Sequence, residues 1–196
     1  IIATLLVAHS LPARADSPLT STPFWTAYRD VAEVMAAHDI ERLNTRLATY
    51  LVSDAPIDRK AAVINALSWN VNGRENAVLF REVLGQRYHV APTEVERRLT
   101  ATETFCLAYL TALDDYFHPQ RARALAQRAR QGLPRSFTAA MVGTLIEAQA
   151  QMKHFERIWP LTRRVLEDRH LQLDMRNAAR DRIVAYMQLY QSYATH

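Results

Sequence analysis

Short polar turns recur along this chain, and their spacing constrains the fold more than any other feature. The turns are His38-Asp39, Asn72-Gly73, Phe117-His118 and Lys153-His154. The first apolar residues expected to be buried after them are Leu43, Ala77, Ala122 and Ile158, at intervals of 34, 45 and 36 residues. A period of about 34 residues is typical of stacked helical hairpins, because one hairpin cannot bury its apolar face alone. The spacing therefore predicts an all-α fold in which antiparallel helical hairpins stack as a short α-solenoid.

The composition agrees with this prediction. The chain has only 4 glycines among 196 residues, and β-branched residues rarely alternate with polar ones, which disfavours strands. We expect about nine helices, over residues 23–37, 39–51, 56–71, 73–85, 95–117, 119–133, 137–152, 155–165 and 174–193. The last helix lacks a partner and would cap the stack. No low-complexity linker interrupts residues 16–196, so these should form a single helical-repeat domain.

Local signals indicate where several helices begin and end. Thr93 and Glu96 have the spacing of a capping box, and we expect the long fifth helix to start there. Ser136 should cap the seventh helix, because a serine side chain at this position accepts a hydrogen bond from the first turn. Pro160 lies inside the eighth helix, where it removes a backbone donor and should kink the helix or delay its start.

The N-terminus resembles a truncated signal peptide. Residues 1–11 are almost entirely apolar, and Ala13-Arg14-Ala15 fits the small-x-small pattern of a signal-peptidase site. We therefore expect residues 1–15 to be a signal peptide and the protein to be periplasmic or secreted. An exported protein meets little nucleic acid, so nucleic acid is not expected as a partner. No later apolar run approaches the length of a membrane span, so the chain should not span a membrane.

Charge is distributed unevenly. Residues 16–117 carry 10 Lys and Arg against 14 Asp and Glu, whereas residues 118–196 carry 13 against 6. An arginine-rich C-terminal half could bind an anionic polymer of the cell envelope. A genome rich in GC would also favour arginine over lysine without any functional meaning, and both interpretations stay open.

The later units resemble tetratricopeptide repeats. In that family a small residue, a turn, an aromatic residue and further small residues follow at set positions. Ala148, the run from Met152 to Ile158, and Val165 occupy such positions, as do residues 118–122 with Ala126 and Ala129. The resemblance covers residues 93–170, although the turn glycine of the family is replaced at Phe117-His118 and Lys153-His154. It implies a protein-binding role.

In a solenoid, the first helix of each hairpin usually lines the concave binding face. We expect the binding residues to be Asn65, Trp69, Asn70, Glu103, Gln149 and Gln151, together with Arg157, Arg163 and Arg164. Trp69 and Asn70 are the strongest candidates, because an aromatic anchor flanked by amides suits a peptide groove. The alternative for Trp69 is that it fills the core.

Few residues suggest catalysis. Asp114 and His118 are four residues apart and would share a helix face, which could serve one proton or one metal ion, but two ligands are too few for a zinc site. Cys106 lies in an apolar helix row and should be a buried structural thiol. No Ser-His-Asp order, glycine-rich phosphate loop or paired-cysteine motif is present, and no metal or other cofactor is expected.

These patterns favour a non-catalytic protein-binding scaffold or adaptor of the bacterial cell envelope. Two alternatives follow from the same residues. The first is a protein that binds an anionic envelope polymer through its arginine-rich C-terminal half. The second is a small all-α hydrolase or lyase that uses Asp114 and His118.

Overall fold

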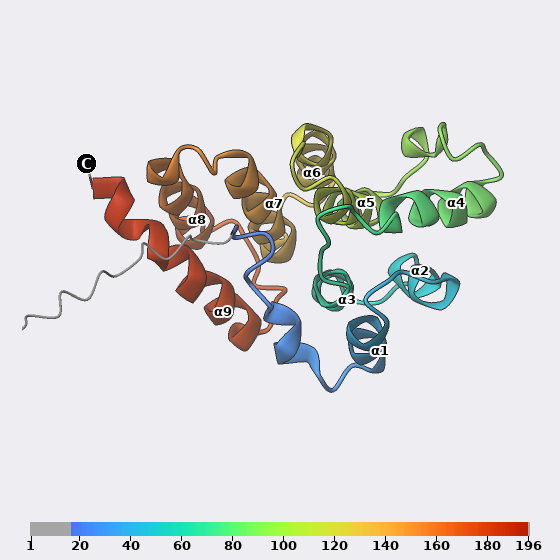
Figure 1. Cartoon of the computed structure of the whole chain (residues 1–196), viewed down its shortest axis with the longest axis horizontal. Coiled ribbons are helices and arrows are strands. Elements are labelled where there is room, and N and C mark those ends of the chain that lie inside the picture. Colours follow the sequence, from blue (N-terminus) through green and yellow to red (C-terminus); the bar gives the residue numbers. More distant parts are fainter. Residues whose placement is uncertain (1–16, 196) are drawn as a thin grey trace, which may run out of the picture.

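The computed structural model describes residues 17–195 and confirms the all-α prediction (Figure 1). Within this range the helices are α1 (Ala32–Ile40), α2 (Thr45–Leu51), α3 (Ile57–Ala66), α4 (Asn76–Tyr88), α5 (Ala101–Asp114), α6 (Gln120–Gly132), α7 (Phe137–Ala150), α8 (Ile158–Glu167) and α9 (Asn177–Met187). Four 3₁₀ segments accompany them: η1 (Phe24–Tyr28), η2 (Val95–Arg97), η3 (Phe155–Arg157) and η4 (Gln188–Thr195). The expected signal peptide, residues 1–15, lies outside the described residues. Between residues 17 and 195, every helix is too short or too polar to cross a bilayer.

The helices pack mainly against their neighbours in the sequence, as a solenoid-like arrangement requires (Figure 1). Two of them form the centre of the core, because α5 and α7 are buried around most of their circumference. The α5–α6 pair is the most closely packed: a Cβ atom added to Gly132 in α6 would lie 2.5 Å from the Cβ of Ala101 in α5. Cys106 in α5 is completely buried, and burial raises the pKa of its thiol to about 12, so the expectation of a structural thiol is confirmed.

Successive turns of the stack are tied together by polar contacts between residues 33 positions apart. Arg74 contacts Glu41 over 2.8 Å, and Arg42 contacts Glu75 over 3.4 Å. The backbone N–H of Leu43 donates to Oδ1 of Asn76 over 2.8 Å. This interval agrees with the first spacing read from the sequence, so the turns that define the repeat also hold it in register.

The first and last parts of the described residues also meet, which a simple linear stack would not require. The segment η1 packs against α9 (Figure 1). The guanidinium of Arg176 donates to Oδ2 of Asp30 over 2.9 Å and lies 4.5 Å from the ring centroid of Tyr28. The hydroxyl of Tyr28 accepts a hydrogen bond from the backbone N–H of Arg176. The N-terminal segment is therefore held between α3 and the last helix.

Most of the predicted helices have different bounds in the structure: the last, expected over 174–193, is divided into α9 and η4, and the first three differ most. The first, expected over 23–37, is divided into η1 and α1, because the extended backbone of Val31 separates them. The second begins at Thr45 rather than near Asp39, since Glu41 ends α1 in a left-handed conformation and Asn44 caps α2. The third ends at Ala66 and not at 71, so Trp69 lies in the loop that follows α3.

The predicted capping box at Thr93 and Glu96 was wrong. The same four-residue pattern recurs at Thr100 and Glu103, and there both reciprocal hydrogen bonds form, so α5 starts at Ala101. Glu96 instead contacts Arg121 over 2.6 Å and Arg81 over 3.5 Å. Glu96 is thus engaged by ionic contacts with α4 and α6, and of the two equivalent capping patterns only the one at Thr100 and Glu103 forms.

Two other local predictions were confirmed. Oγ of Ser136 accepts a hydrogen bond from the backbone N–H of Ala139 over 3.0 Å and caps α7. Pro160 lies in the first turn of α8, where the missing N–H has no partner within the helix to lose. The proline therefore delayed the start of the helix until Ile158, and η3 precedes it.

Candidate functional site

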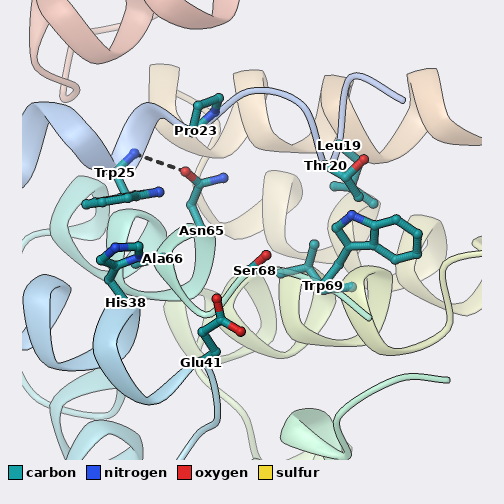
Figure 2. A pocket seen from close by; sticks show the side chains of 11 residues that line it. Leu19, Thr20, Pro23, Trp25, His38, Glu41, Asn65, Ala66, Ser68 and Trp69 are labelled. Atoms are coloured by element: carbon teal, nitrogen blue, oxygen red, sulfur yellow. Dashed lines mark hydrogen bonds between the residues drawn. The ribbon is translucent and has the colours of Figure 1, made fainter. Parts of the chain in front are cut away.

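A small cleft opens where the N-terminal segment crosses the ends of α1 and α3. Its volume is about 120 Å³. The residues that line it are Leu19, Thr20, Pro23, Trp25, His38, Glu41, Asn65, Ala66, Ser68, Trp69 and Leu113. Figure 2 shows Trp25 and Trp69 on two sides of this space, with the carboxylate of Glu41 and the hydroxyl of Ser68 between them. We call it the tryptophan cleft. Aromatic walls with a few directed polar groups are typical of a binding site.

Trp25 is held in the cleft wall by three neighbours. Its indole stacks on the imidazole of His38, with the ring centroids 4.1 Å apart. Its backbone N–H donates to Oδ1 of Asn65 over 3.0 Å (Figure 2). The guanidinium of Arg29 lies 5.7 Å from the indole centroid, within the range of a cation–π contact. The position of this side chain is therefore set before any ligand arrives.

Trp69 reaches the cleft because the chain turns sharply after α3. Ser68 has a φ of 60°, which directs the next residue away from the helix axis. The indole of Trp69 stacks on the ring of Tyr116, with centroids 4.7 Å apart, and is partly buried against the core. Trp69 thus lies at the edge of the core and also faces the cleft.

Two of the four non-glycine residues with positive φ among residues 17–195, Glu41 and Ser68, line this cleft. The left-handed conformation costs about 1–2 kcal/mol for such residues. Both also end a helix, where this conformation is common. Glu41 keeps one carboxylate oxygen 2.8 Å from Nη2 of Arg74 and its side chain is about half exposed, so the carboxylate remains open to a ligand.

Asn65, one of the predicted binding residues, has all its polar atoms engaged within the protein. Its Oδ1 accepts from Trp25, and its Nδ2 donates to the carbonyl of Thr22 over 3.1 Å and to the hydroxyl of Tyr109 over 3.0 Å. The residue is 9% exposed. Asn65 therefore fixes the N-terminal segment to α3 and α5, and borders the cleft as part of its frame.

The other predicted amides lie in different places. Asn70 is exposed in the loop after Trp69, and its Oδ1 accepts from the backbone N–H of Asn72. Gln149 is buried, hydrogen bonds with Ser17 and donates to the carbonyl of Tyr116 over 3.1 Å. Gln151 lies just after α7 and donates to Glu147 over 3.0 Å. Of these three, only Asn70 is on the loop that forms the cleft.

Glu103 is 4% exposed and serves as a structural carboxylate. It accepts hydrogen bonds from the hydroxyl of Tyr88 over 2.6 Å and from the backbone N–H of Thr100 over 2.9 Å. Nε of Arg87 lies 3.5 Å from its other oxygen. These contacts join the end of α4 to the start of α5.

Asp114 and His118, the catalytic candidates, bind different partners. The carboxylate of Asp114 accepts hydrogen bonds from the backbone N–H groups of Arg74 and Ala77 at the start of α4. Burial raises its pKa, while these amides act in the opposite direction. The imidazole of His118 is exposed and lies 2.9 Å from Oδ1 of Asp115. In the part of the chain that the structure describes, no group of three His, Cys, Asp or Glu side chains could hold a metal ion.

The three C-terminal arginines do not converge on one site in their contacts. Arg157 lies 3.6 Å from Glu156 and 3.4 Å from Gln151. Arg163 lies 3.6 Å from Glu167, one turn further along α8. Arg164 is exposed on the same helix.

The sequence prediction missed Trp25, His38, Glu41 and Ser68 as cleft residues. The available signal was a second tryptophan, Trp25, near the N-terminal end of the first predicted helix. Comparison with family models, with curated proteins and with solved structures finds no significant match for this chain. The resemblance to tetratricopeptide repeats therefore stays a hypothesis.

Proposed function

We propose that this protein binds a segment of another protein and acts as a scaffold or adaptor without catalysing a reaction. The observation that supports the proposal is the tryptophan cleft, where two partly buried indoles border one concave space. Partly buried tryptophans are frequent anchors in protein interfaces, because a large apolar surface is covered at a small cost in side-chain entropy.

The surroundings of the cleft support a protein ligand. Ile40, Val71 and Phe117 are 50%, 59% and 62% exposed, and each belongs to a segment that forms or borders the cleft. The ring of Phe117 packs edge-on against Tyr116, which in turn stacks on Trp69. Single exposed apolar residues are ordinary, but several beside an aromatic cleft favour a docking surface.

The place of action, the bacterial cell envelope, is part of the same proposal. It depends on residues 1–15 and their likeness to a signal peptide. Neither alternative has a structural observation in its favour. Arg157 and Arg163 already lie near carboxylates, and Asp114 is occupied as a helix cap.

Site-specific photo-crosslinking in the native cell tests the proposal. A photoreactive amino acid is placed at Val71, next to the cleft, and in a control at Leu189, which is equally exposed at 60% but belongs to η4. We expect one dominant protein to crosslink from position 71 and not from position 189. Trp69→Ala in the position-71 variant should reduce the yield about tenfold or more, as for an interface anchor.

Two results would contradict the proposal. One is the same set of proteins captured from both positions. The other is an unchanged yield with Trp69→Ala in a variant whose circular dichroism shows the native helix content.

A further inference from the structure

A second cavity lies apart from the tryptophan cleft, where the turn between α2 and α3 meets the end of α4 and the start of α5. Its volume is about 370 Å³. The residues that line it are Val52, Ser53, Asp54, Ala55, Ile57, Lys60, Arg87, Thr100, Thr102 and Glu103. None of the residues proposed for protein binding, apart from Glu103, belongs to it.

The buried ammonium of Lys60 is the unusual feature of this cavity. Lys60 is only 3% exposed, although lysine is rarely buried without a paired charge. Among the described residues, no carboxylate oxygen lies within 4.0 Å of its Nζ. Within residues 17–195, its one hydrogen-bond acceptor is the carbonyl of Ser53, just after α2. An ammonium has three hydrogens to donate, so the bond to Ser53 uses one of them.

A charge in such a place is disfavoured unless water or a counterion reaches it. An anion bound in the cavity beside Lys60 would compensate the positive charge of its ammonium. Two further groups on the cavity wall favour a negative charge there. Arg87 is about half exposed at the rim, and Thr102 lies in the first turn of the 14-residue helix α5, where backbone N–H groups have no acceptor within the helix.

The carboxylates on the wall limit the charge of the ligand. Glu103 is already bound to Tyr88 and Thr100, and Asp54 is exposed at the rim. Two cationic and two anionic side chains therefore border the cavity, so its wall carries no net charge, and an anion is favoured only beside Lys60 and Arg87. Val52 and Ile57 add an apolar wall, which suits an organic group and not a bare inorganic ion.

We propose that this cavity binds a small organic carboxylate, held through the ammonium of Lys60 and the guanidinium of Arg87. This site is independent of the tryptophan cleft and of the proposed protein-binding function. The carboxylate could come from a free metabolite or from the C-terminus of a polypeptide, since both carry the same group.

The test is a titration of the ¹⁵N-labelled protein with acetate, followed by amide chemical shifts. Acetamide, which has the same shape without the charge, and chloride at matched ionic strength are the controls. We expect saturable shifts at Ala101 and Thr102 with acetate alone. Lys60→Met should weaken binding about tenfold or more, because a charge-assisted hydrogen bond is lost. N-acetyl-alanyl-alanine then distinguishes the sources: tighter binding than acetate indicates a polypeptide C-terminus, and equal or weaker binding indicates a free carboxylate.

Arg87→Gln keeps the test decisive if Lys60→Met fails to fold, and it should also weaken acetate binding. Arg182→Gln, at an exposed site on α9, is the matched control and should bind as the unaltered protein does. Equal shifts with acetate and chloride would overturn the proposal. So would acetate binding that is unchanged in a folded Lys60→Met or Arg87→Gln variant.

Discussion

The carboxylate of Asp114 caps a helix that begins 38 residues before it in the sequence: its Oδ2 accepts a hydrogen bond from the backbone N–H of Ala77 over 2.7 Å. The start of α4 has no side-chain cap of its own. A similar long-range contact supplements the Ser136 cap of α7, where Oδ1 of Asp174 accepts from the backbone N–H of Thr138 over 2.7 Å. Side chains from a later unit thus complete the helix starts of an earlier one, which makes the stack cooperative.

Removing this cap should destabilise the protein. We expect Asp114→Ala to lower the free energy of unfolding by about 1–2 kcal/mol, as for other helix caps. His118→Ala, which alters an exposed imidazole on the same turn, should change it by less than about 0.5 kcal/mol. Urea unfolding followed by circular dichroism measures both. An equal loss in the two variants would show that the pair acts as a unit.

The choice between two capping boxes can be tested in the same way. Thr100→Ala should lower the free energy of unfolding by about 1 kcal/mol, because the first turn of α5 loses its acceptor. Thr93→Ala should have almost no effect, since no hydrogen bond of its side chain is present in the structure of residues 17–195. A reversed order of the two losses in thermal unfolding would contradict the observed start of α5.

Two helical glycines should respond in opposite directions to the same substitution. Gly132→Ala should destabilise the protein by about 1–3 kcal/mol, because the added methyl would overpack the α5–α6 contact at Ala101. Gly143→Ala should stabilise it by about 0.5–1 kcal/mol, since nothing lies within 4 Å of the new Cβ and alanine favours the helix. Denaturant midpoints of the two variants are the comparison, and a stabilising Gly132→Ala would rule out the tight contact.

The stabilising contact between Asp30 and Arg176 should weaken at low pH. The hydrogen bond from Arg176 lowers the pKa of Asp30 from 3.8 to about 2. A lowered pKa means that the ionised carboxylate stabilises the fold above pH 4, and that this contribution is lost as the pH falls from 4 towards 2. Asp30→Asn should therefore have a lower thermal midpoint than the unaltered protein above pH 4. The difference between the two midpoints should become smaller as the pH falls from 4 towards 2.

Arg176→Gln provides the matched test of that pH dependence. With the guanidinium absent, Asp30→Asn should change the slope of stability with pH much less than it does otherwise, because the hydrogen bond from Arg176 is the largest cause of the lowered pKa. If Asp30→Asn changes the slope as much in the Arg176→Gln background as in the unaltered protein, another group sets the pKa of this carboxylate.

Much of the fold was predictable because it depends on patterns that act over short distances. Apolar residues at helical spacing and turns about 34 residues apart require helices that bury their faces against neighbours. Ser136 and Pro160 act within one helical turn, so their effects could be read directly. The burial of Cys106 was predictable from the row of apolar helix residues in which it lies.

The site was less predictable, because its residues come together only through contacts between distant segments. The prediction included Trp69 and Asn65 but omitted Trp25 and Glu41, which reach the cleft from the N-terminal segment and the end of α1. No local pattern distinguishes a tryptophan that fills a core from one at its edge. The difference depends on Ser68, whose left-handed backbone turns Trp69 out of the helix.

The sequence by itself determined the all-α class, the length of the repeat and the helix starts whose caps are local. Tertiary structure alone decided which of two identical capping patterns begins α5, that Asp114 is a cap, and that η1 closes against α9. The physical reason is the range of the forces involved. Backbone hydrogen bonds and apolar periodicity act between residues close in the chain. The pairing of charges and the formation of clefts depend instead on which surfaces the stacked helices bring together.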